Sequence, residues 1–490
     1  MALLLIAHAA LAFSASTRKS VTYDEVAHLT AGYSYWTTRD FRLVPEHPPL
    51  AELWAALPLM AADLAFPPLD QPAWWGSDQW TLGRAFLFTL GNDLSFMLGA
   101  SRFMIVVLSA ALGLGVFFWS KRLFGTAGGF VSLVLYALSP TTLAHAALVT
   151  TDMAVALFFT LAVCASWSVL QRVTALRVAA GGLAVAGLLL AKMSGLLILP
   201  MLVVMVVVRV ASRAPLPVVL GKRWTVGPRV ARVRVLAGVA VVQTCIVWGL
   251  IWAAYGFRFD AMVDAEPGRD RFGVYMQRVP DGTSWDQELA GAGAAAPLIA
   301  SALDLRLLPE AYLYGIAHTI NSTRVRQAFL NGRRTMHGFT AFFPYCLLVK
   351  TPLPLFGVII LALIAYAARR RRGTRGADDP PVTTIMAYDT IPAWTLLVVY
   401  LCVSMASPMN IGHRHILPIY PVLFLVAGAA ASLLRHPRRL ARWSVPAMLA
   451  AHAAVSLTTW PNYIAFFNTT VGGPRTAYRQ TLMRWWMPLS

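Results

Sequence analysis

Two carboxylates stand side by side near the start of the chain, in the segment Thr22-Tyr23-Asp24-Glu25. A carboxylate just outside a membrane helix is costly unless it is solvated, paired or used in chemistry. One such group can accept the proton of a hydroxyl or amine that attacks a substrate. The alternative is structural: Asp24 and Glu25 would lie in the first turn of a helix and interact favourably with its dipole.

A second acidic motif follows at Glu46 and His47, directly before Pro48 and Pro49. Glu beside His can bind a metal or act as an acid and base, and the prolines fix the backbone just after the pair. The same motif also fits an ordinary loop turn. The requirement for a cofactor therefore stays open, with a divalent metal ion at Glu46 and His47 as the candidate.

Two more charged residues stand at the edges of apolar runs. Asp152 follows Thr150 and Thr151 at the start of one run and could cap a helix there. Lys192 interrupts the long apolar stretch 178–208. A lysine at that depth needs an anionic partner, unless its side chain reaches the membrane surface.

The segment 407–415 brings one arginine and two histidines together, as His413, Arg414 and His415. Arginine binds phosphate oxygens in bidentate fashion, so a phosphate is a natural ligand for this cluster. An internal salt bridge is the alternative. A second basic patch, between Arg324 and His337, could hold a lipid phosphate or merely anionic headgroups.

The elements that must position these residues are membrane helices. Hydrophobic residues make up 58% of the 490-residue chain and charged residues 13%, and the mean hydropathy is +0.61. Backbone groups in lipid must bond within their own segment, so apolar runs that approach membrane length should be helical. The pattern predicts an all-α, polytopic membrane bundle of about eleven helices, at 1–16, 100–120, 126–143, 152–170, 176–191, 194–209, 235–255, 341–367, 391–407, 415–434 and 443–460.

Lys and Arg concentrate in every second gap between these runs, and short basic loops stay in the cytoplasm. The acidic loops are then extracytoplasmic, including 17–99 and 256–340, the two longest. Helices at 49–60 and 80–90 should lie at the membrane interface. We expect a single domain over 1–490, in the cell inner (plasma) membrane, with its active site extracytoplasmic. The net charge of +19 is assigned to contact with membrane lipids and not to nucleic acid. The four cysteines lie in or beside apolar runs and are interpreted as packing residues.

The chain resembles the membrane-embedded GT-C glycosyltransferases, in particular bacterial relatives of the protein O-mannosyltransferases and aminoarabinose transferases. The matching stretches run in order along nearly the whole chain: Tyr23-Asp24-Glu25, Glu46-His47-Pro48-Pro49-Leu50, Thr150-Thr151-Asp152, Lys192-Met193-Ser194, Lys350-Thr351-Pro352-Leu353-Pro354, Asn410-Ile411-Gly412-His413-Arg414-His415, and Tyr463 to Asn468 followed by Gly472-Gly473-Pro474. Relatives often continue with a further polar region beyond the position of Ser490. If that region contributes to acceptor binding, we expect a truncated end or a different acceptor.

The resemblance implies a sugar donor linked to polyprenyl phosphate, an inverting transfer, and an acceptor that is a protein, lipid or glycan. By motif position Asp24 would be the catalytic base, and Glu25 and Asp152 would support it or orient the acceptor. The donor phosphate would be bound by Lys192, Arg414, His415 and His413. Two other classes remain as alternatives: a transporter or flippase, and a non-catalytic assembly protein. The absence of a visible repeat and the gathering of charge at one face disfavour a transporter.

Overall fold

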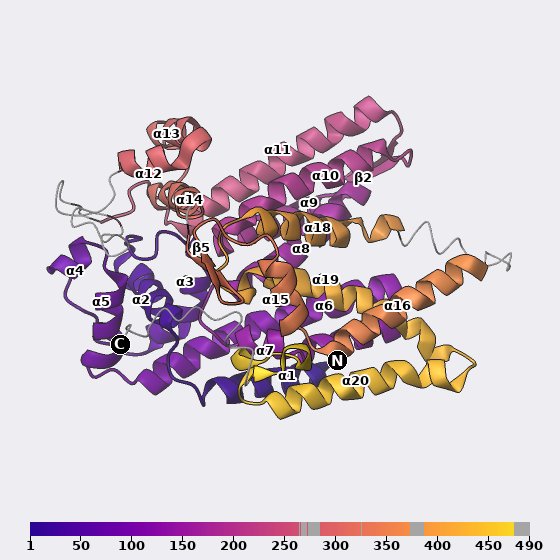
Figure 1. Cartoon of the computed structure of the whole chain (residues 1–490). Helices are drawn as coiled ribbons and strands as arrows, with labels where there is room; N and C mark the ends of the chain where they lie inside the picture. The colour runs from indigo at the N-terminus through magenta and orange to yellow at the C-terminus, as the bar shows by residue number, and fades with distance from the viewer. Residues whose placement is uncertain (264, 266–271, 273–284, 325, 373–386, 475–490) are drawn as a thin grey trace.

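The computed structural model describes residues 1–263, 265, 272, 285–324, 326–372 and 387–474. Long helices run side by side through the molecule (Figure 1). They are α1 (Ala2–Ser16), α6 (Leu94–Ala137), α8 (Asp152–Gln171), α9 (Ala175–Ala191), α10 (Ile198–Ala211), α11 (Arg229–Ala254), α16 (Leu353–Arg372), α18 (Ile391–Ala406), α19 (Tyr420–Gly428, between the 3-10 turns His413–Ile419 and Ala429–Arg435) and α20 (Arg439–Thr459). The chain is therefore an α-helical, multi-pass membrane bundle.

Each of the eleven predicted runs contains a helix, but the number of spans stays a prediction. Five of the described helices are long and apolar enough to cross a membrane, or six if one bent pair counts as a span. The element α6 holds two predicted runs. Its chain reverses at Gly125, where φ is 73°. Hydrogen bonds from Ser132 to Ser120 and from Tyr136 to Ser109 then hold the second half against the first.

The predicted span at 341–367 is not a single straight helix. The structure breaks it into α15 (Phe342–Lys350) and α16, which are bent by 99°. Pro352 and Pro354 explain the break, because proline lacks an amide hydrogen and clashes with the preceding turn of a helix. The carbonyls freed at the bend accept hydrogen bonds from Asn468, which donates to Leu348 and Thr351.

Both long loops gather at the same end of the bundle (Figure 1). The first carries α2 (Tyr23–Thr38), α3 (Leu50–Ala56) with a 3-10 turn (Leu57–Ala61), α4 (Pro72–Trp75), α5 (Gln79–Arg84) and a π turn (Ala85–Thr89). The second carries α12 (Trp285–Ala292), α13 (Ala296–Asp304), α14 (Glu310–Ser322) and the hairpin of β4 (Ala328–Leu330) with β5 (Arg333–Thr335). The segments 49–60 and 80–90 are thus helical, while their depth in the membrane stays a prediction. The short helix α7 (Pro140–His145) precedes α8.

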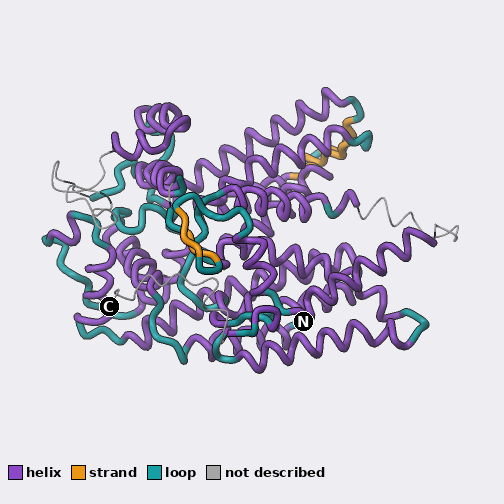
Figure 2. Tube along the Cα trace, in the orientation of Figure 1, coloured by secondary structure: helices purple, strands orange, loops and turns teal. Residues whose placement is uncertain are grey.

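The opposite end carries a small sheet and the basic turns. Strand β2 (Leu216–Leu220) pairs in parallel with β1 (Val173–Thr174) and antiparallel with β3 (Lys222–Val226), and Figure 2 shows these strands apart from the loop end. The core between the ends is apolar, with Phe159 and Phe424 fully buried. Large apolar side chains stay exposed on α10 and α11, as expected of a surface that faces lipid.

Candidate active site

Four charged residues from distant parts of the chain form one connected group, called here the charge cluster. Arg414 donates from Nη1 to Oδ2 of Asp24, and its Nε lies 3.7 Å from Oδ2 of Asp152. The Nζ of Lys192 lies 2.7 Å from Oδ1 of Asp152. Asp24, Asp152, Lys192 and Arg414 were all predicted as site residues, and the structure brings them together.

Each member of the charge cluster stands where a helix begins or ends. Asp24 lies in the first turn of α2, which is held by a capping box between Thr22 and Glu25. Asp152 is the first residue of α8. Lys192 follows α9 with an extended backbone, and Arg414 follows Gly412 at the start of a 3-10 turn. Helix ends leave side chains free to point along the bundle axis, so charges from four segments can meet at one end.

The side chains of the charge cluster differ in their exposure to solvent. The side chains of Asp24 and Arg414 are 26% and 31% exposed, while that of Asp152 is only 2% exposed. Asp152 therefore lies behind its two cations and holds them in place. Asp24 and Arg414 form the accessible edge, where a substrate can reach both a proton acceptor and a bidentate cation.

Glu25 has a different environment from its neighbour Asp24. It is fully buried, and Arg102 donates to both of its oxygens at 2.8 and 2.7 Å. The amide of Val149 donates to it as well. Arg102 also binds the carbonyls of Ser16, Lys19 and Ser20. Glu25 thus forms a buried ion pair that connects α2 to α6 and is shielded from solvent. Sequence reasoning missed Arg102, although a lone arginine in the apolar start of α6 was the available signal.

A second group of acids and imidazoles lies beside the charge cluster, and we call it the acid–histidine cluster. The Nδ1 of His28 lies 2.8 Å from Oε1 of Glu52, and the His28 ring stacks on His47 with centroids 5.2 Å apart. Gln79 donates to Oε1 of Glu46 at 3.3 Å. Glu46 and His47 were predicted; His28 and Glu52 were missed. His28 stands four residues after Asp24, which puts both on one face of α2.

Three atoms of the acid–histidine cluster are buried without a hydrogen-bond partner among the described residues. They are Oε2 of Glu46, Oε2 of Glu52 and Nδ1 of His47. A buried polar atom left without a partner costs about 1–3 kcal/mol. Each carboxylate thus forms a hydrogen bond within the protein through one oxygen, and its other oxygen can accept a hydrogen bond from a ligand or water.

The protonation states of this cluster follow from its surroundings. Burial lowers the pKa of His28, but the hydrogen bond and charge of Glu52 outweigh it, so the pKa is raised overall. Burial, His28 and the charges of Lys192 and Arg414 hold the pKa of His47 well below its usual range. Burial raises the pKa of Glu46. His47 is therefore a neutral imidazole whose free nitrogen can accept or donate one hydrogen bond.

The candidate metal site at Glu46 and His47 lacks the ligands of a zinc site. Within the described residues, no three His, Cys, Asp or Glu side chains converge in a way that could hold a metal ion. Zinc sites in proteins take three or four such ligands.

The two predicted histidines flanking Arg414 differ in their contacts. His413 Nε2 lies 2.6 Å from the hydroxyl of Tyr420, which bonds Thr351 at the α15–α16 break. His413 is thus turned toward the bundle. His415 lies near Lys192 and Asp152, and its buried Nε2 has no partner among the described residues. Of the two, His415 is the one placed to bind a ligand.

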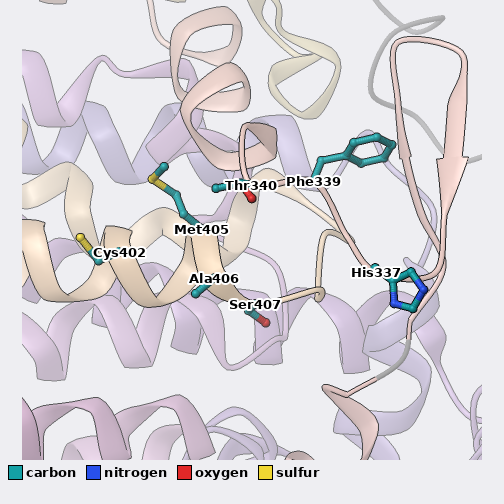
Figure 3. Close-up of a pocket in the computed structure, with 7 residues that line it drawn as sticks. All are labelled: His337, Phe339, Thr340, Cys402, Met405, Ala406 and Ser407. Atoms are coloured by element: carbon teal, nitrogen blue, oxygen red, sulfur yellow. The ribbon is translucent and has the colours of Figure 1, made fainter.

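A cavity of about 440 Å³ lies beside this region, between the end of α18 and the segment that follows β5 (Figure 3). Its lining mixes apolar and polar side chains, namely His337, Phe339, Thr340, Cys402, Met405, Ala406 and Ser407. None of the predicted catalytic or phosphate-binding residues lines it. Burial and the charge of Arg414 lower the pKa of Arg326, another residue of the second long loop.

Comparison with solved structures returns proteins of one class. The matched proteins are an aminoarabinose transferase, ArnT, and an archaeal oligosaccharyltransferase, both GT-C glycosyltransferases. The crystal structure of ArnT from Cupriavidus metallidurans in the apo state aligns with 94% of this chain and 79% of its own, at 15% identity and a TM-score of 0.36. The same ArnT bound to undecaprenyl phosphate aligns over the same shares, at 15% identity and a TM-score of 0.35.

The oligosaccharyltransferase of Archaeoglobus fulgidus, in complex with Zn and sulfate, aligns with 94% of this chain and 52% of its own, at 13% identity and a TM-score of 0.47. No family model and no curated protein matches the sequence. Because all three TM-scores lie below 0.5, the roles assigned below rest on the geometry of this chain.

Proposed function

We propose that this protein transfers a sugar from a polyprenyl-phosphate donor to a hydroxyl or amine of a protein, lipid or glycan, at the extracytoplasmic face of the inner membrane. The observation that carries the proposal is the charge cluster. It offers a carboxylate and an arginine at one accessible edge, with the less exposed cation of Lys192 behind them, at the loop end of a membrane bundle. A phosphorylated lipid can bring its phosphate to that edge while its tail stays in the membrane.

Arg414 and Lys192 bind the donor phosphate in this scheme. Both cations are held by Asp152, so they are positioned before the donor arrives and need little reorganisation. His415, with its free Nε2, can add a hydrogen bond to a phosphate oxygen. These groups stabilise the negative charge that grows on the phosphate as it leaves.

Asp24 accepts the proton of the acceptor. The acceptor oxygen or nitrogen forms a bond to the anomeric carbon, and the bond from that carbon to the phosphate oxygen breaks. The electron pair of the broken bond leaves with the phosphate, and the proton passes to Asp24 and then to water. Attack from the face opposite the phosphate inverts the configuration. Because Arg414 pairs with Asp24 in the donor-free protein, the phosphate must draw Arg414 away before Asp24 can act as a base.

The experiment that tests the proposal is a transfer assay in membranes with a panel of undecaprenyl-phosphate sugars, the lipid being the one named for the ArnT complex. We expect at least one donor to give an acceptor-linked, labelled product. Free undecaprenyl phosphate should inhibit transfer, and Arg414→Ala should weaken that inhibition.

Arg84→Ala is the matched control, because Arg84 is an exposed arginine of α5 at the same end of the molecule. It should leave the inhibition constant unchanged. An equal inhibition constant for wild type and Arg414→Ala would contradict the assignment of Arg414 to the phosphate. No transfer from any donor would contradict the function itself.

A further inference from the structure

The acid–histidine cluster has free hydrogen-bonding capacity that the proposed reaction does not use. Two carboxylate oxygens, on Glu46 and Glu52, and one imidazole nitrogen, on His47, are buried without partners among the described residues. The three side chains surround His28. Glu52 forms a hydrogen bond with His28, the ring of His47 stacks on it, and Glu46 precedes His47 in the chain. Three unpartnered atoms around one histidine indicate a built binding surface and not an isolated packing defect.

The remaining contacts hold these groups still. Gln79 donates to one oxygen of Glu46 and in turn accepts from the amide of Val44. His28 fixes the other carboxylate, that of Glu52, which is 1% exposed. Each acid is thus oriented through one oxygen, so that its second oxygen has a defined direction.

The position of the cluster relates it to the donor phosphate. Asp24 and His28 stand one turn apart on α2, and His47 lies near enough to Lys192 and Arg414 to feel their charges. A group attached to a phosphate bound at Arg414 and Lys192 would therefore lie close to His47 and the neighbouring acids. In a polyprenyl-phosphate sugar, the sugar is the group attached to that phosphate.

The chemistry of the free atoms selects the kind of ligand. Carboxylate oxygens accept hydrogen bonds and repel anions, so the cluster suits a ligand that donates hydrogen bonds. Sugar hydroxyl and amino groups are such donors. We infer that Glu46, Glu52 and His47 form the subsite that recognises the sugar of the donor by accepting hydrogen bonds from its hydroxyl or amino groups. This inference rests on the proposed function and assigns the sugar-recognition part of the same site.

The test compares lipids with and without the sugar. Equilibrium binding is measured for undecaprenyl phosphate and for its mannose, glucose and arabinose derivatives, with the full-length protein in lipid nanodiscs. In the wild type, at least one sugar-bearing lipid should bind more tightly than undecaprenyl phosphate. Glu46→Gln should weaken binding of that lipid about tenfold, as expected for loss of a hydrogen bond to a charged acceptor, and leave undecaprenyl phosphate unchanged.

Asp70→Asn is the matched control, since Asp70 is an exposed carboxylate of the same loop, and it should change neither affinity. His47→Asn is a second variant that tests the subsite if Glu46→Gln does not fold. Equal affinity of the wild type for all four lipids would overturn the inference while leaving the phosphate site intact. Equal weakening of sugar-bearing and sugar-free lipids by Glu46→Gln would overturn it too. Failure of the wild type to bind any of the lipids would remove the proposed function as well.

Discussion

Substitutions of the adjacent carboxylates Asp24 and Glu25 should have different effects, one on the transfer reaction and the other on the stability of the protein. We expect Asp24→Asn to lower transfer by about 10²–10⁴-fold, the usual contribution of a general acid or base. The Asp24–Arg414 pair is partly exposed, and exposed pairs contribute about 0.2–1 kcal/mol. The variant should therefore fold, insert and melt nearly as the wild type does.

Glu25→Gln should lower the stability of the protein and leave most of its transfer rate per folded molecule. Glu25 is fully buried and compensates the charge of Arg102, which is itself 3% exposed. Breaking a buried pair by removing one partner costs about 3–5 kcal/mol, because the remaining charge stays buried without compensation. Arg102 also loses its orientation toward the carbonyls of Ser16, Lys19 and Ser20. The melting temperature should drop by several degrees.

The assay measures both variants in parallel, with transfer per folded molecule in membranes and thermal melting by size-exclusion of the detergent-solubilised protein. Glu25→Gln should retain most of its transfer rate per folded molecule at low temperature. A Glu25→Gln protein that melts like the wild type but does not transfer would refute the reasoning and make Glu25 the reacting group. Asp24→Asn with the turnover of the wild type would remove Asp24 as the base.

Three further predictions concern the supports of the site. Asp152→Asn and Lys192→Met should each destabilise the protein more than the double variant does, because each single variant leaves one charge of the pair without its partner. Additive effects of the two substitutions in a double-mutant cycle would argue against a coupled pair. The raised pKa of His28 means that its stabilisation is complete below about pH 6.5, its unfolded value, and is lost as the pH rises through the folded value. Melting temperature should thus fall more steeply above pH 6.5 in the wild type than in His28→Gln, and parallel curves would contradict the pairing with Glu52. Asn468→Ala should lower the melting temperature by leaving two carbonyls at the α15–α16 break without donors, at about 1–3 kcal/mol each, and an unchanged value would show that water replaces the amide.

The positions of the charged residues along the chain were predictable, and their partners were not. Apolar runs located the helix that begins at Asp152 and the break at Lys192, because hydrophobicity is a local property of the sequence. The alternation of basic loops indicated that these residues share one end with Asp24. It could not show which cation faces which carboxylate, since that depends on how α2, α8 and the turn at Arg414 pack in three dimensions.

Of the residues that escaped prediction, Arg102 and Glu52 did so for different physical reasons. Arg102 looked like an ordinary residue at the start of an apolar helix, and its role depends on carbonyls in the loop before α2. Glu52 lies in a segment whose pattern predicted an interfacial helix, where an acid is expected to be solvated. In the structure it is turned inward to His28. Both cases need a long-range contact that no local pattern encodes.

The sequence left two competing explanations for Arg414, a phosphate ligand and an internal salt bridge. Arg102 is an arginine with a structural role, and its environment differs from that of Arg414. Arg102 is 3% exposed and donates to both oxygens of Glu25 and to three carbonyls. Arg414 is 31% exposed and is held from one side by Asp24 and Asp152. A guanidinium used only for structure gains from enclosure, because solvent weakens its ion pairs. Arg414 keeps an open edge while Asp152 anchors it from behind, which is the arrangement that a cation needs if it is to exchange a carboxylate for an incoming phosphate. In the proposed function, the internal salt bridge is therefore the resting state of the phosphate site.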